Sequence, residues 1–425
     1  MFDILVVGGG AAGFYAAIHA AEANPELRIA ILERGKQVLT KVKVSGGGRC
    51  NVTHAAFDPA ALVKHYPRGE KELLGPFYTH ASGDTVAFFE EKGVALKTEE
   101  DGRMFPETNS SQTIIDCFLT TAESLGIKIL KNSSVTALIA PNKEENLWQV
   151  KSIRGMYKTK KLLVATGSNP KIWKLLQELE HTIVPPVPSL FTFNIKDSRI
   201  EGIQGVSTPA KVTVIPIKLS AAKITIALKS KVVDANALTA EGPLLITHWG
   251  MSGPAILKLS AWGARQLSDY GYRFNIVVNW LPQYHEAAVL PLLMEIKSVE
   301  GKKTVLRTKA VELPRRLWTK LVKASGISET TTWAEVSKVA LQALVKQLTK
   351  GEFVVDGKST FKEEFVTAGG VDLKEINFKT FESKIQPGLF FAGEVINVDA
   401  ITGGFNFQNA WTSGYLAAKG MAKES

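Results

Sequence analysis

The chain has 425 residues, enough for two or three domains that each bury a hydrophobic core. Apolar residues make up 45% of it and charged residues 22%, proportions of ordinary globular proteins that exclude extensive disorder. No apolar run reaches the ~18 residues that a membrane-spanning helix needs, so a transmembrane protein is not expected.

The charges and cysteines narrow the choice of partner and location. Lys and Arg outnumber Asp and Glu by 51 to 41, a formal net charge of +10 that can attract nucleic acid or an anionic ligand. The basic residues are densest at residues 302–323, but they alternate there with apolar residues at helical spacing. This favours a solvated helix face, so nucleic acid is not the expected partner. Cys50 and Cys117 form no disulfide framework and favour the reducing cytoplasm.

The first residues have the pattern of a β-α-β unit that binds a nucleotide. Residues 4–7 form an apolar run typical of a central parallel strand. A glycine-rich turn at residues 8–13 follows, and residues 14–23 predict an Ala-rich helix. Residues 28–33 predict the second strand of the unit.

The glycines of this turn have a spacing that fits a pyrophosphate. Gly8 allows the tight turn, Gly10 lets a ligand approach the backbone, and Gly13 lets helix and strand pack closely. The N–H groups at the start of the helix then face the phosphates. Glu33, 20 residues after Gly13, can accept ribose hydroxyls. Together these features predict a bound dinucleotide, whereas the alternative is a turn that only packs two elements.

A second glycine-rich loop, SGGGRCN at residues 45–51, predicts an anion-binding nest to which Arg49 adds positive charge. Lys41 is a candidate for a phosphate contact, although a single lysine is usually exposed. Flavin-dependent disulfide reductases carry a second cysteine five residues after the first, but here that position is Ala55. Dithiol chemistry is therefore not expected, and Cys50 fits a small residue of a tight loop better than a lone nucleophile.

The middle of the chain predicts one helix, at residues 110–125, and then strands at residues 127–130, 134–139, 148–153 and 161–166. The last of these ends in Ala165-Thr166-Gly167, a turn that flavoproteins often place beside the cofactor. Residues 184–189, VPPVPS, are predicted to be a linker.

After the linker the pattern changes. Strand-like segments without long helices between them predict an antiparallel sheet or barrel, at residues 190–195, 210–218, 223–230 and 273–280. Helical periodicity then predicts helices at residues 286–298, 314–324 and 332–348. The simplest organisation is a nucleotide domain interrupted by a β-rich and a helical insert.

The C-terminal part contains a second cofactor motif, GLFFAGEVINVDAITGGFN, at residues 388–406. An apolar run ends at Gly393-Glu394, where the carboxylate can accept a ribityl hydroxyl. The glycine pair at 403–404 precedes a predicted helix at residues 406–421, whose N-terminus would point at the flavin pyrimidine ring. An NAD enzyme needs only the first motif, so the two motifs together predict FAD.

Two residues outside these motifs are candidates for the chemistry. His248, in THWGMSGP, precedes a helix predicted to begin at Pro254 and fits a structural role as well as a proton donor. Arg103, in GRMFP, either faces the substrate or bridges to a backbone carbonyl. The seven histidines lack metal-ligand spacing, so no metal is expected.

Segments along the whole chain resemble a bacterial flavoprotein family that includes BaiN-type reductases and aminoacetone oxidase. They are VVGGGAAG, SGGGRCNVTH, DGRMFP, ITHWGMSGPAIL, VTAGGVDLKEI, FESKI and GLFFAGEVINVDAITGGFNFQNAWTSGY. The resemblance implies an α/β fold with a Rossmann-like FAD-binding domain in two segments, interrupted by a β-barrel-like and a helical subdomain. The FAD domain would comprise residues 1–188 and 352–425, the β-rich insert residues 189–283, and the helical insert residues 284–351.

The motifs and the resemblance together give the expected FAD contacts. These residues are Gly8, Gly10, Ala11, Ala12, Gly13, Glu33, Arg34, Lys41, Ser45, Gly46, Gly47, Gly48, Arg49, Cys50, Asn51, Val135, Ala165, Thr166, Gly167, Gly393, Glu394, Gly403, Gly404, Phe405 and Asn406. Two positions depart from the family pattern: Ser168 replaces an expected glycine, and Phe381 replaces the usual methionine of FESKI. Both departures are expected to concern the substrate pocket more than the cofactor.

The sequence therefore predicts a FAD-dependent oxidoreductase that passes a hydride between flavin N5 and a small organic substrate, bound between the FAD domain and the insert. Reduction of an unsaturated molecule by NAD(P)H and oxidation of an amine by O2 both stay open. The alternatives are an RNA-modifying flavoprotein that binds RNA through its basic helical insert, and a flavin-binding protein without enzymatic activity. The oligomeric state is left open.

Overall fold

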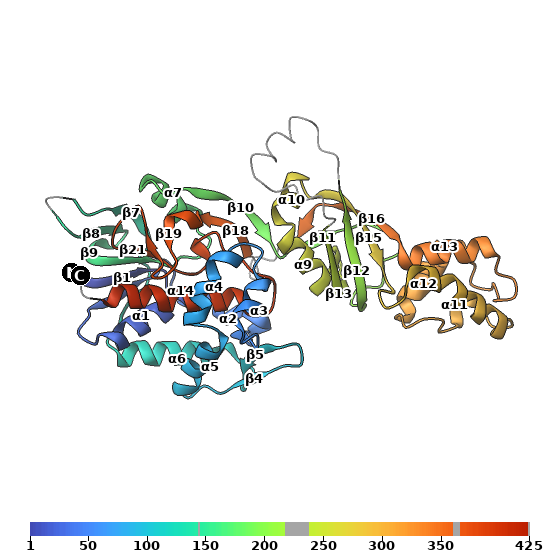
Figure 1. The fold of residues 1–425 in the computed structure, drawn as a ribbon, viewed down its shortest axis with the longest axis horizontal. Coiled ribbons are helices and arrows are strands. Elements are labelled where there is room, and N and C mark those ends of the chain that lie inside the picture. Colours follow the sequence, from blue (N-terminus) through green and yellow to red (C-terminus); the bar gives the residue numbers. More distant parts are fainter. Residues whose placement is uncertain (143–144, 217–237, 360–365, 424–425) are drawn as a thin grey trace. The chain divides into compact units, whose positions relative to one another are not determined.

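The computed structural model describes residues 1–142, 145–216, 238–359 and 366–423. The chain divides into two compact units (Figure 1): unit 1 comprises Met1–Val187 and Lys362–Ser425, and unit 2 comprises Pro188–Phe361. Each unit has its own hydrophobic core, as a chain of this length allows. The strand predicted at residues 223–230 lies outside the described residues.

Unit 1 is built on a mixed sheet, with parallel pairings at its centre and antiparallel pairings outside it. Its strands are β1 (Phe2–Val7), β2 (Ile29–Leu32), β6 (Lys128–Leu130), β7 (Val135–Ile139), β8 (Trp148–Ser152), β9 (Gly155–Val164), β19 (Ile376–Asn377), β20 (Glu382–Ser383) and β21 (Leu389–Phe391). Their order is β19-β20-β21-β9-β1-β2-β6, and β7 and β8 continue antiparallel from β9. Val6 of β1 pairs in parallel with Ile31 of β2 and with Leu163 of β9. Strands β1, β2 and β21 are apolar and buried on both faces, as is typical of parallel strands at the centre of a sheet.

Two helices from opposite ends of the chain, α1 (Ala11–Ala23) and α14 (Phe405–Ala422), lie side by side in unit 1 (Figure 1). Their backbones approach closely at Gly414, where a Cβ atom would lie 2.9 Å from the Ala12 carbonyl oxygen. The remaining helices of unit 1 are α2 (Thr40–Gly48), α3 (Pro59–Leu62), α4 (Glu70–Thr79), α5 (Ser82–Glu91), α6 (Ser111–Ser124) and α7 (Pro170–Glu178). A small sheet of β3 (Thr53–His54), β5 (Arg103–Pro106) and β4 (Leu96–Thr98) completes it.

The predicted linker at residues 184–189 contains the boundary between the two units and forms a strand. It forms β10 (Ile183–Ser189), which pairs with β18 (Val366–Val371) in a two-stranded sheet. Proline is tolerated in such an edge strand because its missing N–H group faces no ladder partner. Gly369 in β18 is required there, because a Cβ atom would lie 2.6 Å from Pro186 Cα.

Unit 2 contains a seven-stranded sheet with antiparallel pairings, as the sequence predicted. The strands are β11 (Thr192–Asn194), β12 (Ser207–Ile215), β13 (Thr239–Ile246), β14 (Gly250–Ser252), β15 (Arg273–Asn279), β16 (Gly351–Asp356) and β17 (Lys358–Ser359), in the order β16-β15-β12-β13-β14-β11-β17. Strand β13 was not predicted, because Gly242 and Pro243 in its middle are unusual in a strand. Strand β16 lies in this sheet although the sequence assigns residues from 352 onward to the FAD domain.

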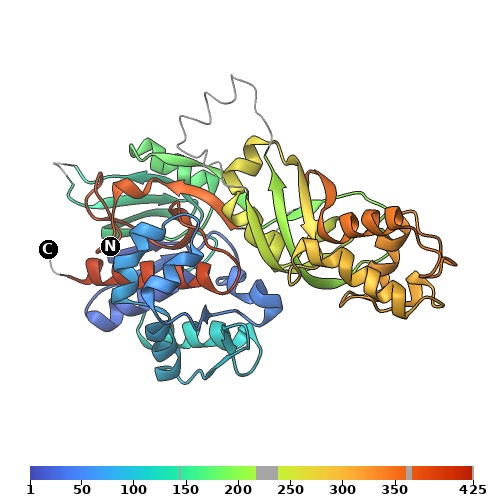
Figure 2. The ribbon, with the colours of Figure 1, turned by 45° about the vertical axis from the view of Figure 1, so that its right-hand side comes forward.

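The helices of unit 2 are α9 (Pro254–Trp262), α10 (Ala264–Asp269), α11 (Glu286–Val299), α12 (Arg315–Ala324) and α13 (Lys338–Thr349). Figure 2 shows the last three, in yellow to orange, gathered at one end of the sheet of this unit. Helices α11 and α12 closely match the predicted segments. Helix α13 begins later than predicted because Ser337 caps it, its Oγ accepting a hydrogen bond from Ala340 N at 3.1 Å.

A buried histidine makes the stability of unit 1 dependent on pH. His80 follows α4, with its Nε2 atom 2.9 Å from the Tyr15 hydroxyl and its ring stacked on Tyr415 at 4.2 Å between centroids. Burial lowers the pKa of His80 from 6.5 to about 4. Between these two values the unfolded chain binds more protons than the folded one, so the free energy of unfolding falls as the pH drops below about 6.5.

We therefore expect the free energy of unfolding to be about 2 kcal/mol lower at pH 5 than at pH 7 through His80 alone. Chemical denaturation between pH 5 and pH 7 measures this change in the free energy of unfolding. In His80→Gln the free energy of unfolding should vary less with pH, because the contribution of His80 is absent. His248→Gln provides a matched control for the substitution itself, because it removes an imidazole from the surface and not from the core. Equal slopes for wild type and His80→Gln would contradict this account.

Candidate functional site

Of the three glycines in the predicted motif at β1 and α1, one has room beside it for a ligand. A Cβ atom on Gly8, which has a φ of 118°, would lie 2.3 Å from the Ala165 carbonyl oxygen, and one on Gly13 would lie 2.1 Å from the Gly8 carbonyl oxygen. Packing of the backbone therefore requires both. A Cβ atom on Gly10 would meet no atom of the described residues within 4 Å. This open space is where the sequence predicts a pyrophosphate.

The surroundings of this turn suit an anion and a sugar. Helix α1 begins after Gly10, and within the described residues no side chain caps its first N–H groups, which therefore carry their partial positive charge toward the open space. Glu33 accepts hydrogen bonds from Gly9 N at 3.0 Å and Gly35 N at 2.7 Å, one on each carboxylate oxygen. Each oxygen keeps a second lone pair for a hydroxyl group.

The glycine-rich loop of residues 45–51 interrupts the end of α2. Ser45 is extended, and Gly46 and Gly47 have φ angles of 57° and 68°. A Cβ atom on Gly47 or Gly48 would contact nothing among the described residues within 4 Å, so this loop also borders open space. Cys50 is buried at its end, and burial raises the pKa of its thiol to about 12. The thiol stays protonated at neutral pH, which argues against a nucleophile.

Arg49 and Arg103 lie together and share an acidic partner. Arg49 Nη1 is 2.6 Å from Glu99 Oε1, and Arg103 Nη2 is 3.1 Å from Glu99 Oε2. Both guanidinium groups lie over the ring of Phe105, at 4.0 Å and 5.5 Å from its centroid. Arg103 also pairs with Asp101 at 2.7 Å. Their positive charges are thus largely balanced by neighbouring carboxylates.

The structure brings the N-terminal and C-terminal motifs together, as one shared site requires. Lys41 Nζ lies 2.6 Å from Glu394 Oε2, across 353 residues of sequence. The Asn51 carboxamide bonds to Gly404 N at 2.9 Å. Gly393 is close to α1, since a Cβ atom on it would lie 3.1 Å from Ala12 Cβ.

The turn before α14 is held from several sides. Asn406 accepts a hydrogen bond from Ala400 N at 3.0 Å and donates one to the Ala400 carbonyl at 3.1 Å. The Phe405 ring packs against the rings of both His54 and His65, with centroids at 4.7 Å and 4.1 Å. Gly404, with a φ of 91°, begins the helix, whose first N–H groups receive no side-chain cap from the described residues.

Two residues beside Glu394 have buried hydroxyl groups without a partner in the described part of the chain: Thr166 and Thr367. Thr166 precedes Gly167, where a Cβ atom would lie 3.5 Å from Glu394 Oε2, and Thr367 N donates to Glu394 Oε1 at 3.2 Å. A buried hydroxyl without a partner is costly unless a ligand satisfies it. Thr367 was not identified from the sequence, although VTAGGVDLKEI was recognised as a family segment.

Three other predicted residues lie at the edges of this region or away from it. Arg34 is exposed, and Val135 begins β7 two residues after Ser133, whose N–H donates to the Glu33 carbonyl. His248 is exposed in the turn between β13 and β14 of unit 2.

The pattern of the HI0933-like protein Rossmann domain matches residues 2–420, which is nearly the whole chain. The chain belongs to the HI0933-like family. This family has a FAD-binding Rossmann fold, and the open glycine turns, the free helix N-termini and the unpartnered hydroxyls of unit 1 fit that cofactor. The chain is therefore a FAD-dependent oxidoreductase, with FAD as its cofactor.

Known proteins resemble this HI0933-like chain over their full length. It is 28% identical to the ribosomal RNA dihydrouridine synthase of Haemophilus influenzae and 27% identical to the Escherichia coli protein of that name, over 99% of this chain and 98% of each relative. It is 26% identical to the 3-dehydro-bile acid delta(4,6)-reductase of Clostridium scindens, over 100% of both chains. The 3-ketosteroid-delta4-(5alpha)-dehydrogenase of Rhodococcus jostii has a related fold, with a TM-score of 0.50, 13% identity, and coverage of 100% of this chain and 97% of that one.

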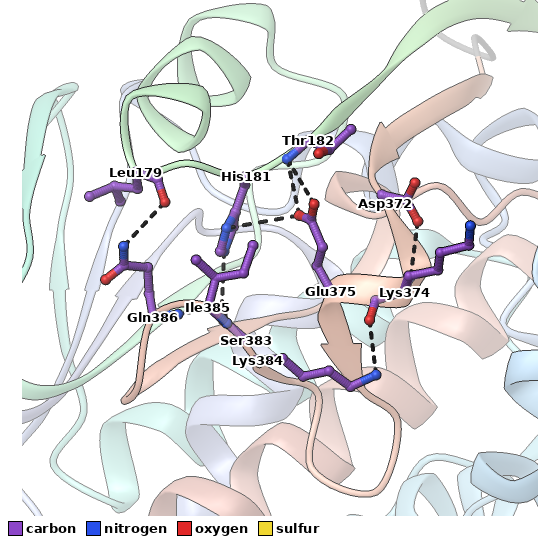
Figure 3. Close-up of polar contacts among 10 residues, drawn as sticks. All are labelled: Leu179, His181, Thr182, Asp372, Lys374, Glu375, Ser383, Lys384, Ile385 and Gln386. Carbon is purple, nitrogen blue, oxygen red and sulfur yellow. Dashed lines mark hydrogen bonds and ion pairs between the residues drawn. The ribbon is translucent and has the colours of Figure 1, made fainter.

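Unit 1 of this HI0933-like protein also contains a buried polar cluster that resembles a hydrolase triad (Figure 3). Ser383 Oγ lies 3.0 Å from His181 Nε2, and His181 Nδ1 lies 4.0 Å from Glu375 Oε2. However, Ser383 is buried, and its Oγ already accepts hydrogen bonds from Ile385 N at 3.0 Å and Gln386 N at 2.9 Å. The hydroxyl therefore ties the hairpin of β20 to His181 and is not available as a nucleophile.

A cavity of about 1040 Å³ in unit 1 is also separate from the cofactor region. It is lined by Ala23 and Ala422, which lie at the C-terminal ends of α1 and α14, together with Phe378 and Lys419. The glycine turns lie at the N-terminal ends of the same helices. Helix C-termini carry partial negative charge, so this cavity does not suit the pyrophosphate of FAD.

None of the helices in the described residues combines the length and apolar character of a membrane span. In the same part of the chain, no three His, Cys, Asp or Glu side chains gather as metal ligands would.

Proposed function

We propose that this protein reduces a carbon–carbon double bond of a nucleobase in RNA, with NAD(P)H as the source of electrons. The observation that carries the proposal is the distribution of charge. Unit 2, residues 188–361, contains 23 Lys and Arg against 13 Asp and Glu, whereas the rest of the chain contains 28 of each. The whole net charge of +10 therefore resides on one unit. Such a concentration of positive charge suits a phosphate backbone.

The densest part of this charge is the segment of residues 302–323, with eight Lys and Arg and a single acid, Glu312. Lys302, Arg307 and Arg315 are exposed and have no acidic partner among the described residues. The segment is compact, because Trp318 Nε1 of α12 donates to the Val305 carbonyl at 3.2 Å. It thus presents unpaired cations from a folded surface.

The relatives support this proposal. Two of them are named ribosomal RNA dihydrouridine synthases, and dihydrouridine is uridine whose ring double bond has been reduced. The third is named a delta(4,6)-reductase, which also denotes reduction of carbon–carbon double bonds. These names favour the reductive direction over the oxidation of an amine by O2. The sequence alone favoured a small-molecule substrate, and the charge of unit 2 changes that preference.

Residues of unit 1 would hold the cofactor in this reaction. The space at Gly10 and the start of α1 would suit the pyrophosphate. Glu33 would accept hydrogen bonds from the ribose hydroxyls, and the start of α14 would face the flavin pyrimidine. Bound FAD would supply a carrier for one hydride, which is two electrons with a proton. Overall, NAD(P)H and one proton convert the double bond to two saturated carbons and leave NAD(P)⁺. The exposed His248 remains a candidate for the proton donor, and a cytoplasmic location would provide NAD(P)H.

Anaerobic spectroscopy tests the reaction. We expect NADH or NADPH to bleach the flavin band near ~450 nm, and unmodified ribosomal RNA to restore it under anaerobic conditions with formation of a reduced base. Restoration by a conjugated enone but not by RNA would favour the second candidate, a reductase of small molecules, which the bile-acid relative supports. Reduction of the flavin by amines but not by NAD(P)H would contradict both.

Binding of RNA should depend on salt through the cations of unit 2. The double variant Arg307→Gln/Arg315→Gln should lower the slope of log affinity against log salt by about 2, roughly one unit for each cation that contacts phosphate. Lys71→Gln/Lys128→Gln removes two exposed cations from unit 1 and serves as the control, with an unchanged slope. If both double variants gave the same slope of log affinity against log salt, the RNA would not contact Arg307 and Arg315.

A further inference from the structure

One tryptophan of unit 2 is unusually exposed. Of the eight tryptophans in the chain, six are at most 4% exposed, Trp262 is 40% exposed and Trp249 is 58% exposed. Trp249 follows the exposed His248 in the turn between β13 and β14. A large aromatic side chain in water loses the stabilisation of burial, so its exposure suggests a partner.

The turn that carries Trp249 is rigidly built. Thr247 Oγ1 accepts hydrogen bonds from Trp249 N and Gly250 N, both at 3.2 Å, and Thr247 N donates to the Gly250 carbonyl at 2.8 Å. The Trp249 carbonyl accepts a hydrogen bond from Ile195 N at 3.0 Å. Gly250 has a φ of 146°, and a Cβ atom on it would lie 2.3 Å from the Phe193 carbonyl oxygen. The backbone beneath the indole is therefore fixed before any ligand binds.

This turn is connected to the basic segment of unit 2. Its preceding residue, Ile246, accepts a hydrogen bond from Gly205 N at 2.9 Å. The neighbouring Gln204 carbonyl accepts one from Arg316 Nη2 of α12 at 3.4 Å. On the other side, Lys196 directly follows Ile195; it is exposed and has no acidic partner in the described ranges. Arg316 thus contacts the segment bonded to one side of the turn, and Lys196 lies on the segment bonded to its other side.

From this arrangement we infer that Trp249 stacks on an unpaired nucleobase of the RNA substrate while Lys196 and the 302–323 segment hold the phosphates. The inference rests on the proposed function and adds the residue that engages a base. An aromatic platform beside a basic surface is the usual means of binding single-stranded nucleic acid. A protein partner fits less well, because the exposed neighbours of Trp249 in the chain and across the Ile195 hydrogen bond are the polar His248 and Lys196.

The test uses the FAD-loaded full chain without NAD(P)H and measures anisotropy of two fluorescein-labelled probes, an oligouridine and an abasic oligonucleotide of the same length. Loss of one stacked base weakens binding about tenfold. Trp249→Ala should therefore bind oligouridine about tenfold more weakly and the abasic probe as wild type does. Trp249→Phe should recover most of the loss. Trp262→Ala, which removes the other exposed tryptophan, should bind both probes normally.

Wild-type binding of oligouridine by Trp249→Ala would overturn the inference, and so would equal weakening for both probes, which would indicate a general structural defect. The result is independent of turnover. Base-dependent binding through Trp249 in a protein that never reduces RNA would refute the proposed function and leave the stacking role intact. Conversely, RNA reduction with an unchanged KM in Trp249→Ala would support the function and refute the stacking role.

Discussion

The variant Gly10→Ala is expected to be folded and to bind FAD at least about tenfold more weakly than wild type, a loss of ~1.4 kcal/mol or more. The added methyl group would touch no described protein atom within 4 Å, and the φ of −99° at Gly10 suits alanine. It would instead occupy the space beside the start of α1, where the pyrophosphate is expected. The flavin absorbance per chain and a titration of the apoprotein with FAD measure the effect.

Two further glycine variants separate a lost cofactor from a lost fold. Gly75→Ala also adds a methyl group in open space at an ordinary φ, but in α4, and should keep full FAD binding. Gly8→Ala should lower the melting temperature of the apoprotein, because its Cβ would lie 2.3 Å from the Ala165 carbonyl oxygen. If Gly10→Ala bound FAD as tightly as Gly75→Ala does, the pyrophosphate would not bind at the turn between β1 and α1.

The variant Arg68→Met is expected to lower the free energy of unfolding of unit 1 by about 3–5 kcal/mol. Arg68 forms a bidentate ion pair with Asp399, which is 0% exposed, and the two lie in parts of the chain that are 331 residues apart. Removing the guanidinium would take a bidentate positive partner away from a buried carboxylate, just before the glycine pair that begins α14. FAD affinity should fall together with stability, as denaturation and FAD titration would show.

A surface ion pair provides the comparison for Arg68. Lys64 Nζ lies 2.6 Å from Glu70 Oε1, and the two side chains are 70% and 37% exposed. Lys64→Met should cost less than about 1 kcal/mol. The double variant Arg68→Met/Asp399→Leu should recover much of the stability, since it removes the buried carboxylate together with the guanidinium. An equal, small cost for Lys64→Met and Arg68→Met would show that the buried pair is dispensable.

The features that were correctly predicted depend on patterns of residues that are close together in the sequence. The β1–α1 unit follows from a continuous apolar strand and three glycines at fixed spacing. Helices α11, α12 and α14 follow from periodicity and end within one or two residues of their predicted limits. The family resemblance and the FAD cofactor were likewise confirmed. The FAD contacts assigned to individual residues stay predictions.

The features that were missed depend on contacts between distant segments. Strand β10 exists because β18 pairs with it, although its own prolines disfavour a strand. The Arg68–Asp399 pair and the Thr367–Glu394 contact join residues that no local pattern connects. Phe381, noted as a departure near the substrate pocket, is fully buried and packs against Phe378 at 5.2 Å between centroids, so it belongs to the core.

The pairing of β21 with β9, and of α14 with α1, has a consequence for how the protein is made. Synthesis proceeds from the N-terminus, so the ribosome releases β1, β9 and α1 long before their C-terminal partners emerge. Until then β9 lacks its partner strand β21, so one edge of the sheet is unpaired. Unit 2 is a continuous segment of the chain and can fold during this time. The flavin site is therefore expected to be completed only once β21 and α14 have left the ribosome, after unit 2 has been synthesised.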